Sequence, residues 1–163
     1  MPEALDPLPL LRSLHEHGVE HVVVGGFAVN AHGAIRVTKD LDIVPNPSDR
    51  NLERLAETLS DLDAHLLDAS DFDAEELPAD PTKEDLALGG NFCVLTRLGR
   101  LDVMQWLSGI ESEDLHERLS ASAIESDLDG VPIRVCGLED LRTMKRSAGR
   151  PQDLDDLRRL SES

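Results

Sequence analysis

The sequence predicts an α/β protein in which a mixed β-sheet is flanked by helices and two further helices close the chain. Two observations carry this prediction. Short runs of β-branched and other apolar residues alternate along the chain with segments whose leucines recur at helical spacing. Glycine and proline separate most of these segments, and no internal repeat or linker divides the 163 residues. We therefore expect a single compact domain over residues 1–163.

In the first half of the chain, each expected element follows from a local signal. A leucine stripe after Asp6-Pro7 predicts a helix, and Gly18 lies just past its end. Ser48 is expected to cap a longer helix with leucines at the same spacing. The expected order is the helix from Asp6-Pro7, a strand over Glu20–Val24, a Gly-Gly turn with a short helix over Phe27–His32, a strand over Lys39–Val44, and the helix after Ser48.

The second half of the chain begins with an acidic segment and ends in helices. Asp68–Asp85 contains two prolines and is expected to form a loop, with one turn of helix near Lys83–Leu88. Asp129-Gly130 between two alternating segments predicts a hairpin turn. The expected order after the loop is a strand over Asn91–Thr96, a strand over Arg100–Leu107, a helix over Glu113–Leu119, a hairpin of Ala123–Leu128 and Val131–Cys136, and helices over Leu138–Ser147 and Gln152–Leu160.

Charge and composition limit the surroundings and partners of the chain. The net charge is −17 at pH 7, which opposes sequence-independent attraction to nucleic acid. No apolar run approaches membrane-spanning length, and the N-terminus lacks a basic region followed by an apolar one. We therefore expect a cytoplasmic protein with no membrane partner. Cys93 and Cys136 lack metal-ligand spacing and are expected to be free thiols.

The strongest functional signal is the pair Asp40 and Asp42, in the segment Thr38-Lys39-Asp40-Leu41-Asp42-Ile43. Residues two apart on a strand point to the same face, so these carboxylates are expected side by side. Like charges this close repel each other, and a bridging cation is the usual reason for a fold to keep them together. One or two carboxylates with substrate phosphates are how Mg²⁺ is commonly held, so the pair predicts a site for Mg²⁺ or Mn²⁺.

A phosphate site is expected beside this pair. Gly25-Gly26 follows an apolar strand and precedes a short helix, and glycines there let backbone N–H groups approach a phosphate closely. Arg36 and Thr38 flank the carboxylate strand and are expected to contact phosphate or the oxygens around the metal. A plain tight turn and a solvated strand edge are the alternatives for each motif alone, but their spacing favours a joint metal and triphosphate site.

These motifs carry a resemblance to a known superfamily. The segments Gly25-Gly26-Phe27-Ala28 and Arg36-Val37-Thr38-Lys39-Asp40-Leu41-Asp42-Ile43 resemble the signature of the polymerase-beta-type nucleotidyltransferases. The stretches Leu138–Arg146 and Gly149–Leu157 are similar to the end of small bacterial members, including the AbiEii and toxin-related group. The resemblance implies the nucleotidyltransferase fold and a third carboxylate on a later strand. Many members have Gly-Ser where this chain has Gly25-Gly26.

The resemblance also implies roles for two residues far along the chain. Asp102 is expected to complete the metal site with Asp40 and Asp42 if it faces the same side from a neighbouring strand, and a plain surface position is the alternative. Lys145 is expected to bind the triphosphate, since relatives place a lysine from a C-terminal helix there. Arg142 or Arg146 is then expected near the mouth of the cleft. An ordinary solvated helix residue is the alternative for Lys145.

Other polar or aromatic residues carry weaker signals. Asp153 resembles a functional acid of toxin-type relatives, and helix capping explains it nearly as well. His15, His17 and His21 lack the further ligands of a zinc site and are expected at the surface or at a helix end. Trp106 is expected in the core rather than as a platform for a base.

Two classes of function follow from these residues. The first is an Mg²⁺-dependent nucleotidyltransferase that moves NMP from an NTP onto an acceptor hydroxyl of a tRNA, a protein or a small molecule. The second is a nucleotide-binding or toxin–antitoxin interaction module, with a partner protein and weak or lost catalysis. The intact carboxylate set favours the first class. The acidic surface favours a cationic small molecule or a partner protein over RNA.

Overall fold

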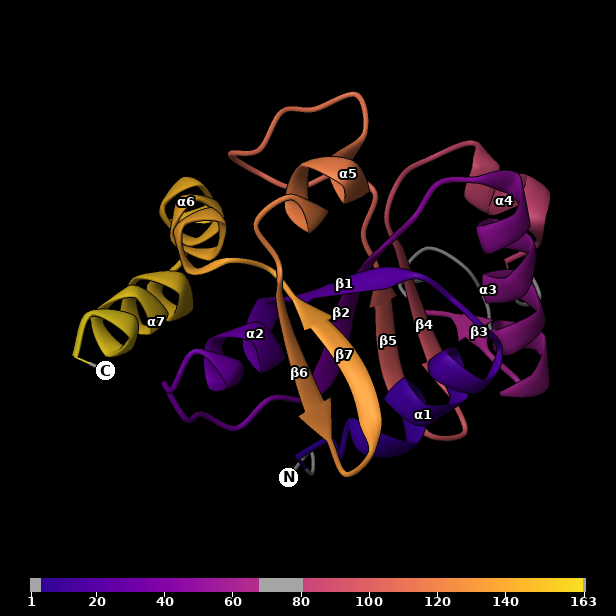
Figure 1. Ribbon diagram of the computed structural model, residues 1–163, viewed down its shortest axis with the longest axis horizontal. Coiled ribbons are helices and arrows are strands. Elements are labelled where there is room, and N and C mark those ends of the chain that lie inside the picture. The colour runs from indigo at the N-terminus through magenta and orange to yellow at the C-terminus, as the bar shows by residue number, and fades with distance from the viewer. Residues whose placement is uncertain (1–3, 68–80, 163) are drawn as a thin grey trace.

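A computed structural model describes residues 4–67 and 81–162. Its centre is a seven-stranded mixed sheet in the order β3-β4-β5-β2-β1-β7-β6 (Figure 1). The strands are β1 (His21–Val24), β2 (Asp40–Pro45), β3 (His65–Leu66), β4 (Phe92–Thr96), β5 (Gly99–Val103), β6 (Ile124–Leu128) and β7 (Val131–Val135). The helices are α1 (Leu8–Glu16), α2 (Gly25–Ala31), α3 (Asp49–Asp61), α4 (Lys83–Ala87), α5 (Leu115–Ser120), α6 (Leu138–Ala148) and α7 (Pro151–Glu162). The predicted α/β class, with a mixed sheet and C-terminal helices, is confirmed.

The register of the central strands brings distant segments of the chain together. β2 is parallel to β5 on one side, where Asp42 lies opposite Asp102. It is antiparallel to β1 on the other side, where Asp42 lies opposite Val24. α2 begins directly after Val24, so the start of α2 and the two carboxylates gather at one end of the central strands.

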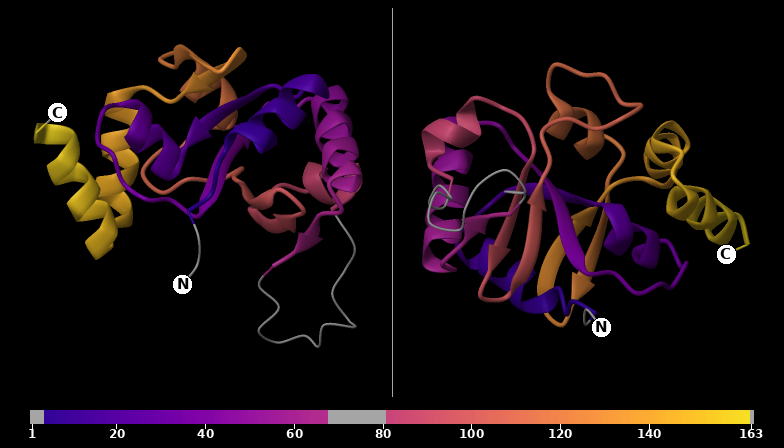
Figure 2. Two further views of the ribbon diagram at one scale, coloured as in Figure 1. Left: turned by 90° about the horizontal axis from the view of Figure 1, so that it is seen from below. Right: turned by 180° about the vertical axis from the view of Figure 1, so that it is seen from behind.

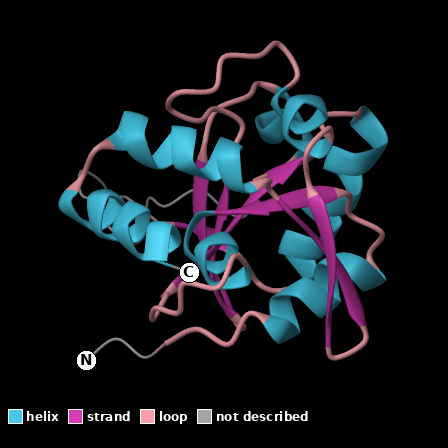
Figure 3. Ribbon diagram, turned by 60° about the vertical axis from the view of Figure 1, so that its left-hand side comes forward, coloured by secondary structure: helices cyan, strands magenta, loops and turns pink. Residues whose placement is uncertain are grey.

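The helices surround this sheet and bury its apolar residues (Figure 3). α1 and α3 are strongly amphipathic, and leucines such as Leu10, Leu14, Leu55 and Leu59 are fully buried. The Ser48 hydroxyl accepts a hydrogen bond from the Asn51 backbone N–H, which confirms the predicted cap of α3. α3 and α4 pack together at one end of the molecule, and α6 and α7 pack together at the opposite end (Figure 2).

Some boundaries differ from the sequence predictions. β5 ends at Val103 instead of reaching Leu107. Beyond Val103, the backbone N–H groups of Gln105 and Trp106 donate to the side-chain oxygen of Asn91 instead of pairing with a strand. α2 begins at the first glycine of the Gly-Gly pair rather than at Phe27. The short strand β3 is an element that no local signal predicted.

The predicted acidic loop over Asp68–Asp85 lies, up to residue 80, outside the described residues. The expected helical turn beyond it is present as α4, which begins with a capping box between Thr82 and Asp85. In the part of the chain that the structure describes, no helix has both the length and the apolar character needed to span a bilayer.

Candidate metal and nucleotide site

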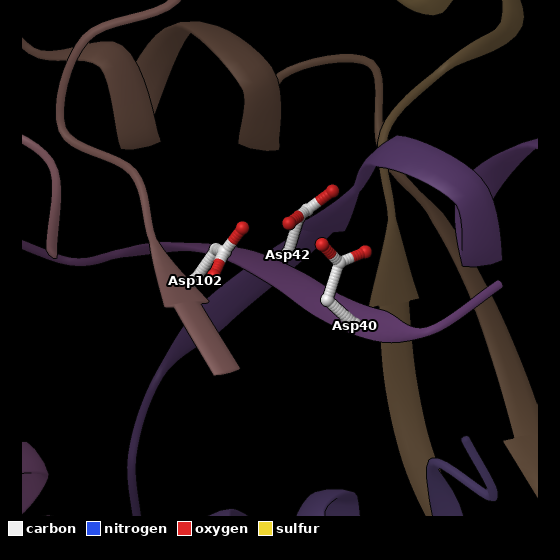
Figure 4. Close-up of side chains that lie close together, drawn as sticks. All are labelled: Asp40, Asp42 and Asp102. Carbon is white, nitrogen blue, oxygen red and sulfur yellow. The ribbon is translucent and has the colours of Figure 1, made fainter. Parts of the chain in front are cut away.

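Asp40, Asp42 and Asp102, here called the carboxylate trio, point toward one another from two neighbouring strands (Figure 4). Asp40 and Asp42 alternate along β2 with Leu41 and Ile43, which are fully buried on the opposite face. One carboxylate oxygen from each member of the trio lies within 4.8 Å of the others. Asp102 therefore lies on the same face of a neighbouring strand, as its predicted role required.

Electrostatics show what this arrangement costs the protein. Burial and the charges of Asp40 and Asp102 raise the pKa of Asp42 to about 8. Burial, followed by the charge of Asp102, also raises the pKa of Asp40. Among the described residues, the trio is the one group of three or more acidic, histidine or cysteine side chains close enough to hold a metal ion. Three converging carboxylate oxygens with no soft ligand suit a hard divalent cation such as Mg²⁺ or Mn²⁺.

Arg100 is the cation that sequence reasoning missed beside the trio. Its Nε donates to Asp102 Oδ1 at 2.9 Å, and a terminal nitrogen donates to Asp102 Oδ2 at 3.1 Å. The same Nε lies 3.6 Å from Asp40 Oδ2. The signal was available in the sequence, because residues two apart on β5 share a face, and Arg100 precedes Asp102 by two.

The Gly-Gly pair lies against the trio. Gly25 has φ +70°, and a Cβ there would lie 1.9 Å from Asp42 Oδ2, so only glycine fits this position. A Cβ on Gly26 would lie 2.5 Å from the hydroxyl of Thr38. Thr38 is buried and donates a hydrogen bond to the Asp40 carbonyl at 3.3 Å. This packing gives a physical reason for the departure from Gly-Ser, because a side chain at position 26 would displace Thr38.

A cleft of about 490 Å³ opens over these residues, a size typical of ligand sites. Every residue that the sequence placed in the metal and nucleotide site lines this cleft: Gly25, Gly26, Arg36, Thr38, Asp40, Asp42, Asp102 and Lys145. Arg100, Arg150, Asn91, Met104 and Trp106 line it as well. The structure thus gathers the predicted residues around one cavity, although they come from α2, the segment before β2, β2, β5 and α6.

Lys145 belongs to a buried charge network rather than to the solvated surface. Its side chain is 8% exposed, and Nζ lies 2.9 Å from Asp156 and 3.3 Å from Asp153. Arg36 Nε lies 3.0 Å from Asp156, and Arg150 Nε lies 2.7 Å from Asp153. The alternative of an ordinary solvated helix residue is wrong for Lys145. We call these five residues, which join α6, α7 and the segment before β2, the buried charge network.

Asp153 serves as the capping residue that one sequence interpretation expected. It accepts a hydrogen bond from the Arg150 backbone N–H at 3.1 Å, at the start of α7. Burial alone would raise the pKa of Asp153, but hydrogen bonds from Arg150 and the charge of Lys145 lower it overall. Arg142 and Arg146 do not line the cleft, so the prediction that one of them stands at its mouth is wrong. Residues of α6 three or four apart share a face, and the cleft face carries Leu141, Met144, Lys145 and Ala148 instead.

Further sequence expectations have mixed outcomes. Trp106 is 65% exposed and lines the cleft, so its expected place in the core is wrong. His17 lies at the end of α1, where Nε2 lies 2.7 Å from Asp61, as expected of a helix-end histidine. His21 is half-buried at the start of β1, and burial, with the nearby His116, lowers its pKa to about 4. Cys93 and Cys136 are free, as predicted.

The fold and the clustered carboxylates define a protein of the nucleotidyltransferase class. The chain belongs to the family described as "Nucleotidyltransferase of unknown function (DUF6036)", whose model matches residues 8–161. A search of curated proteins finds no match. The nucleotidyltransferase part of the resemblance is confirmed, and membership of the AbiEii and toxin-related group stays a prediction.

Solved structures share this fold at low sequence identity. The lincosamide antibiotic adenylyltransferase LnuA in its lincomycin-bound form matches with a TM-score of 0.66 and 12% identity, over 98% of each chain. ANT(2")-Ia in complex with adenylyl-2"-tobramycin matches with a TM-score of 0.57 and 16% identity, over 94% of this chain and 84% of that one. An antigenic nucleotidyltransferase-like protein from Paracoccidioides brasiliensis matches with a TM-score of 0.58 and 14% identity, over 93% and 72%.

Proposed function

We propose that this protein is a metal-dependent nucleotidyltransferase that moves NMP from an NTP onto an acceptor hydroxyl. The observation that carries the proposal is the carboxylate trio, with its oxygens within 4.8 Å of one another at the floor of a cleft. Burial and the mutual repulsion of these carboxylates raise the pKa of Asp42, and a bound divalent cation would offset that repulsion.

The trio would hold the cation that the reaction needs. Asp40, Asp42 and Asp102 would hold a divalent ion, which would supply a Lewis acid for the α-phosphate and positive charge for the leaving pyrophosphate. In the transfer, a bond forms between the acceptor oxygen and the α-phosphorus, and the bond from that phosphorus to pyrophosphate breaks. Asp102 is our candidate to receive the proton of the attacking hydroxyl.

The residues proposed to bind phosphate are the Gly-Gly pair and the polar side chains that line the cleft around it. Gly25 and Gly26 line the cleft, and because they carry no side chain their backbone N–H groups can approach a phosphate oxygen closely. Arg36 and Lys145 bring positive charge to the cleft wall, although both are already ion-paired within the protein. Thr38 offers a hydroxyl beside Gly26. These residues are proposed to surround the triphosphate.

A small-molecule acceptor is favoured over tRNA or protein. LnuA was solved with lincomycin and ANT(2")-Ia with adenylyl-2"-tobramycin, so two proteins of this fold use small acceptors or carry their products. The charge of −17 also disfavours an RNA acceptor, which depends on free lysine and arginine. We therefore propose a small hydroxylated compound as acceptor and a cytoplasmic location.

The test is metal-dependent binding of an NTP analogue. Calorimetry with α,β-methylene-ATP, which cannot transfer its nucleotide, should show binding that requires Mg²⁺ or Mn²⁺ and disappears in Asp42→Asn. The control is Asp155→Asn, which removes an exposed carboxylate of α7 and should bind normally. Metal-independent binding that persists unchanged in Asp42→Asn would overturn the proposal.

A further inference from the structure

The cleft contains an exposed aromatic side chain that the proposed phosphate and metal chemistry does not use. Trp106 is the one tryptophan of the sequence, and it is 65% exposed where it lines the cleft. Met104 and Leu107, its near neighbours in the sequence, line the cleft as well. A tryptophan normally contributes a large buried apolar area, so its exposure inside a cavity leaves that area available to a ligand.

The backbone that carries Trp106 is fixed from both sides. The Asn91 side-chain oxygen accepts hydrogen bonds from the N–H groups of Gln105 at 2.8 Å and Trp106 at 3.1 Å, and its amide donates to the Trp106 carbonyl at 3.2 Å. On the other side, the Ser108 and Ser147 hydroxyls lie 2.6 Å apart. An aromatic ring on a fixed backbone loses little freedom when a ligand stacks on it.

Trp106 lies on the β5 side of the carboxylate trio, whereas the Gly-Gly pair follows β1 on the other side. Nucleotidyl transfer is an in-line displacement, so the attacking hydroxyl approaches opposite the leaving pyrophosphate. In the sheet, β2 lies between β5 and β1, so Asp102 and the Gly-Gly pair flank Asp42 from opposite sides. Trp106 follows β5, beyond Asp102. If the triphosphate lies on the Gly-Gly side, the acceptor lies on the Trp106 side.

The charges of the cleft restrict the acceptor further. Its described lining contains one carboxylate besides the trio, Asp153, and Lys145 and Arg150 already bind it. An acceptor with several ammonium groups would therefore find no spare anion there. Of the described lining cations, Arg36, Arg100, Lys145 and Arg150 are ion-paired within the protein, which leaves Lys39 to meet a phosphate chain such as RNA.

We propose that Trp106, with Met104 and Leu107, forms an acceptor subsite for a small, uncharged compound that carries a flat apolar ring near its reacting hydroxyl. The inference rests on the proposed transferase function and names its acceptor class. Stacking supplies the affinity, and the carboxylate of Asp102 at the edge of the subsite faces the hydroxyl.

The single tryptophan provides a direct probe. Phenyl β-D-glucoside and methyl β-D-glucoside carry the same hydroxyls and differ in the flat ring. With Mg²⁺ and α,β-methylene-ATP present, we expect the phenyl compound to quench the Trp106 fluorescence and to bind at least five-fold more tightly than the methyl compound. Calorimetry on Trp106→Ala should show equal affinity for the two compounds, whereas Trp106→Phe should retain the preference. Leu88→Ala, which truncates an exposed apolar residue outside the cleft lining, is the matched control.

The outcomes separate this inference from the proposed function. Equal binding of the two glucosides by the wild type would overturn the subsite, as would tighter binding of tobramycin or of a short RNA ending in CCA. If the nucleotide analogue alone quenches Trp106 and Trp106→Ala weakens the binding of the analogue, the ring belongs to the donor base and the acceptor assignment is overturned. If neither this analogue nor the α,β-methylene analogues of GTP, CTP and UTP bind, the transferase proposal itself fails.

Discussion

The protein contains two clusters of charged side chains along one cleft, and the clusters differ in how their charges are balanced. The carboxylate trio gathers three like charges, with Arg100 at its edge. The buried charge network alternates charges of opposite sign, with Lys145 between Asp153 and Asp156 and with Arg36 and Arg150 on their far sides. Asp153 and Asp156 are at most 1% exposed, yet each has a cation at 3.3 Å or closer.

The difference shows which cluster is complete within the chain. In the network each buried charge has a partner, so the network fixes α7 against α6 and the segment before β2. In the trio the charges exceed their partners, and burial together with the charges of Asp40 and Asp102 raises the pKa of Asp42 to about 8. The network therefore stabilises the fold, while the trio is destabilising until a cation from outside binds.

The largest expected effect is a loss of stability on breaking the network. Asp156→Ala leaves Lys145 and Arg36 without the carboxylate between them, and removing one partner of a buried ion pair costs about 3–5 kcal/mol. Urea denaturation should show this loss in the free energy of unfolding. Asp155→Ala, one residue earlier, breaks exposed pairs with Arg158 and Arg159 and should change stability by less than about 1 kcal/mol. A similar small change for both variants would show that the network is not needed for the fold.

The second prediction has the opposite sign. Asp42→Asn removes one of three repelling charges and should stabilise the metal-free protein at pH 8. The rise in pKa from 3.8 to about 8, at about 1.4 kcal/mol for each pKa unit, sets an upper limit of roughly 6 kcal/mol, and because water reaches the cleft and screens the charges we expect about 2–4 kcal/mol. The folded pKa of Asp42 is about 8 against an ordinary value of 3.8, so its contribution is present below the lower value and is lost as pH rises through 8. The gain of the variant over wild type should therefore grow from pH 5 to pH 8 and then level off.

Asp153 supplies the contrasting pH dependence. Its folded pKa is lowered, so its contribution to stability is present above its unfolded pKa and is lost as the pH falls below that value. Denaturation in EDTA between pH 5 and 9 isolates the Asp42 effect from the Asp153 effect. A constant difference between wild type and Asp42→Asn over this range would contradict the raised pKa.

The contrast also explains what the sequence could and could not reveal. The alternation along β2 and the hairpin at Asp129-Gly130 are local patterns, and they predicted the sheet and the same-face pair Asp40 and Asp42. The pairing of Lys145 with Asp156 joins two helices, and its burial depends on how α7 packs, which no local pattern specifies. The prediction of a core position for Trp106 was wrong for a similar reason. The strand was expected to continue to Leu107, but the Asn91 side chain ends it early.

A third prediction concerns the divalent cation that would balance the negative charge of the trio. If Mg²⁺ binds the folded trio and not the unfolded chain, as we propose, it should stabilise wild type by about 1.4 kcal/mol at ten times its dissociation constant. Thermal denaturation with increasing MgCl₂ measures this shift, and KCl at matched ionic strength controls for screening of the −17 charge. Asp42→Asn should show no shift beyond that of KCl. An equal MgCl₂ effect in the variant would place the cation elsewhere on the acidic surface.

The smallest expected effect concerns Arg100. It tests whether the guanidinium competes with a metal ion for the carboxylate oxygens of the trio. Its guanidinium donates to both oxygens of Asp102 and lies 3.6 Å from Asp40, so it occupies ligand atoms that a cation would use and repels that cation as well. Because its side chain is 42% exposed, water screens much of this repulsion. We expect Arg100→Met to tighten Mg²⁺ binding by roughly 3-fold to 10-fold, about 1 kcal/mol, as measured by calorimetry. Arg97→Met, on the turn before β5, removes an arginine without a trio contact and should leave the affinity unchanged. If Arg100→Met instead weakens Mg²⁺ binding, the guanidinium orients Asp102 for the metal, and the trio is better matched within the chain than its charges suggest.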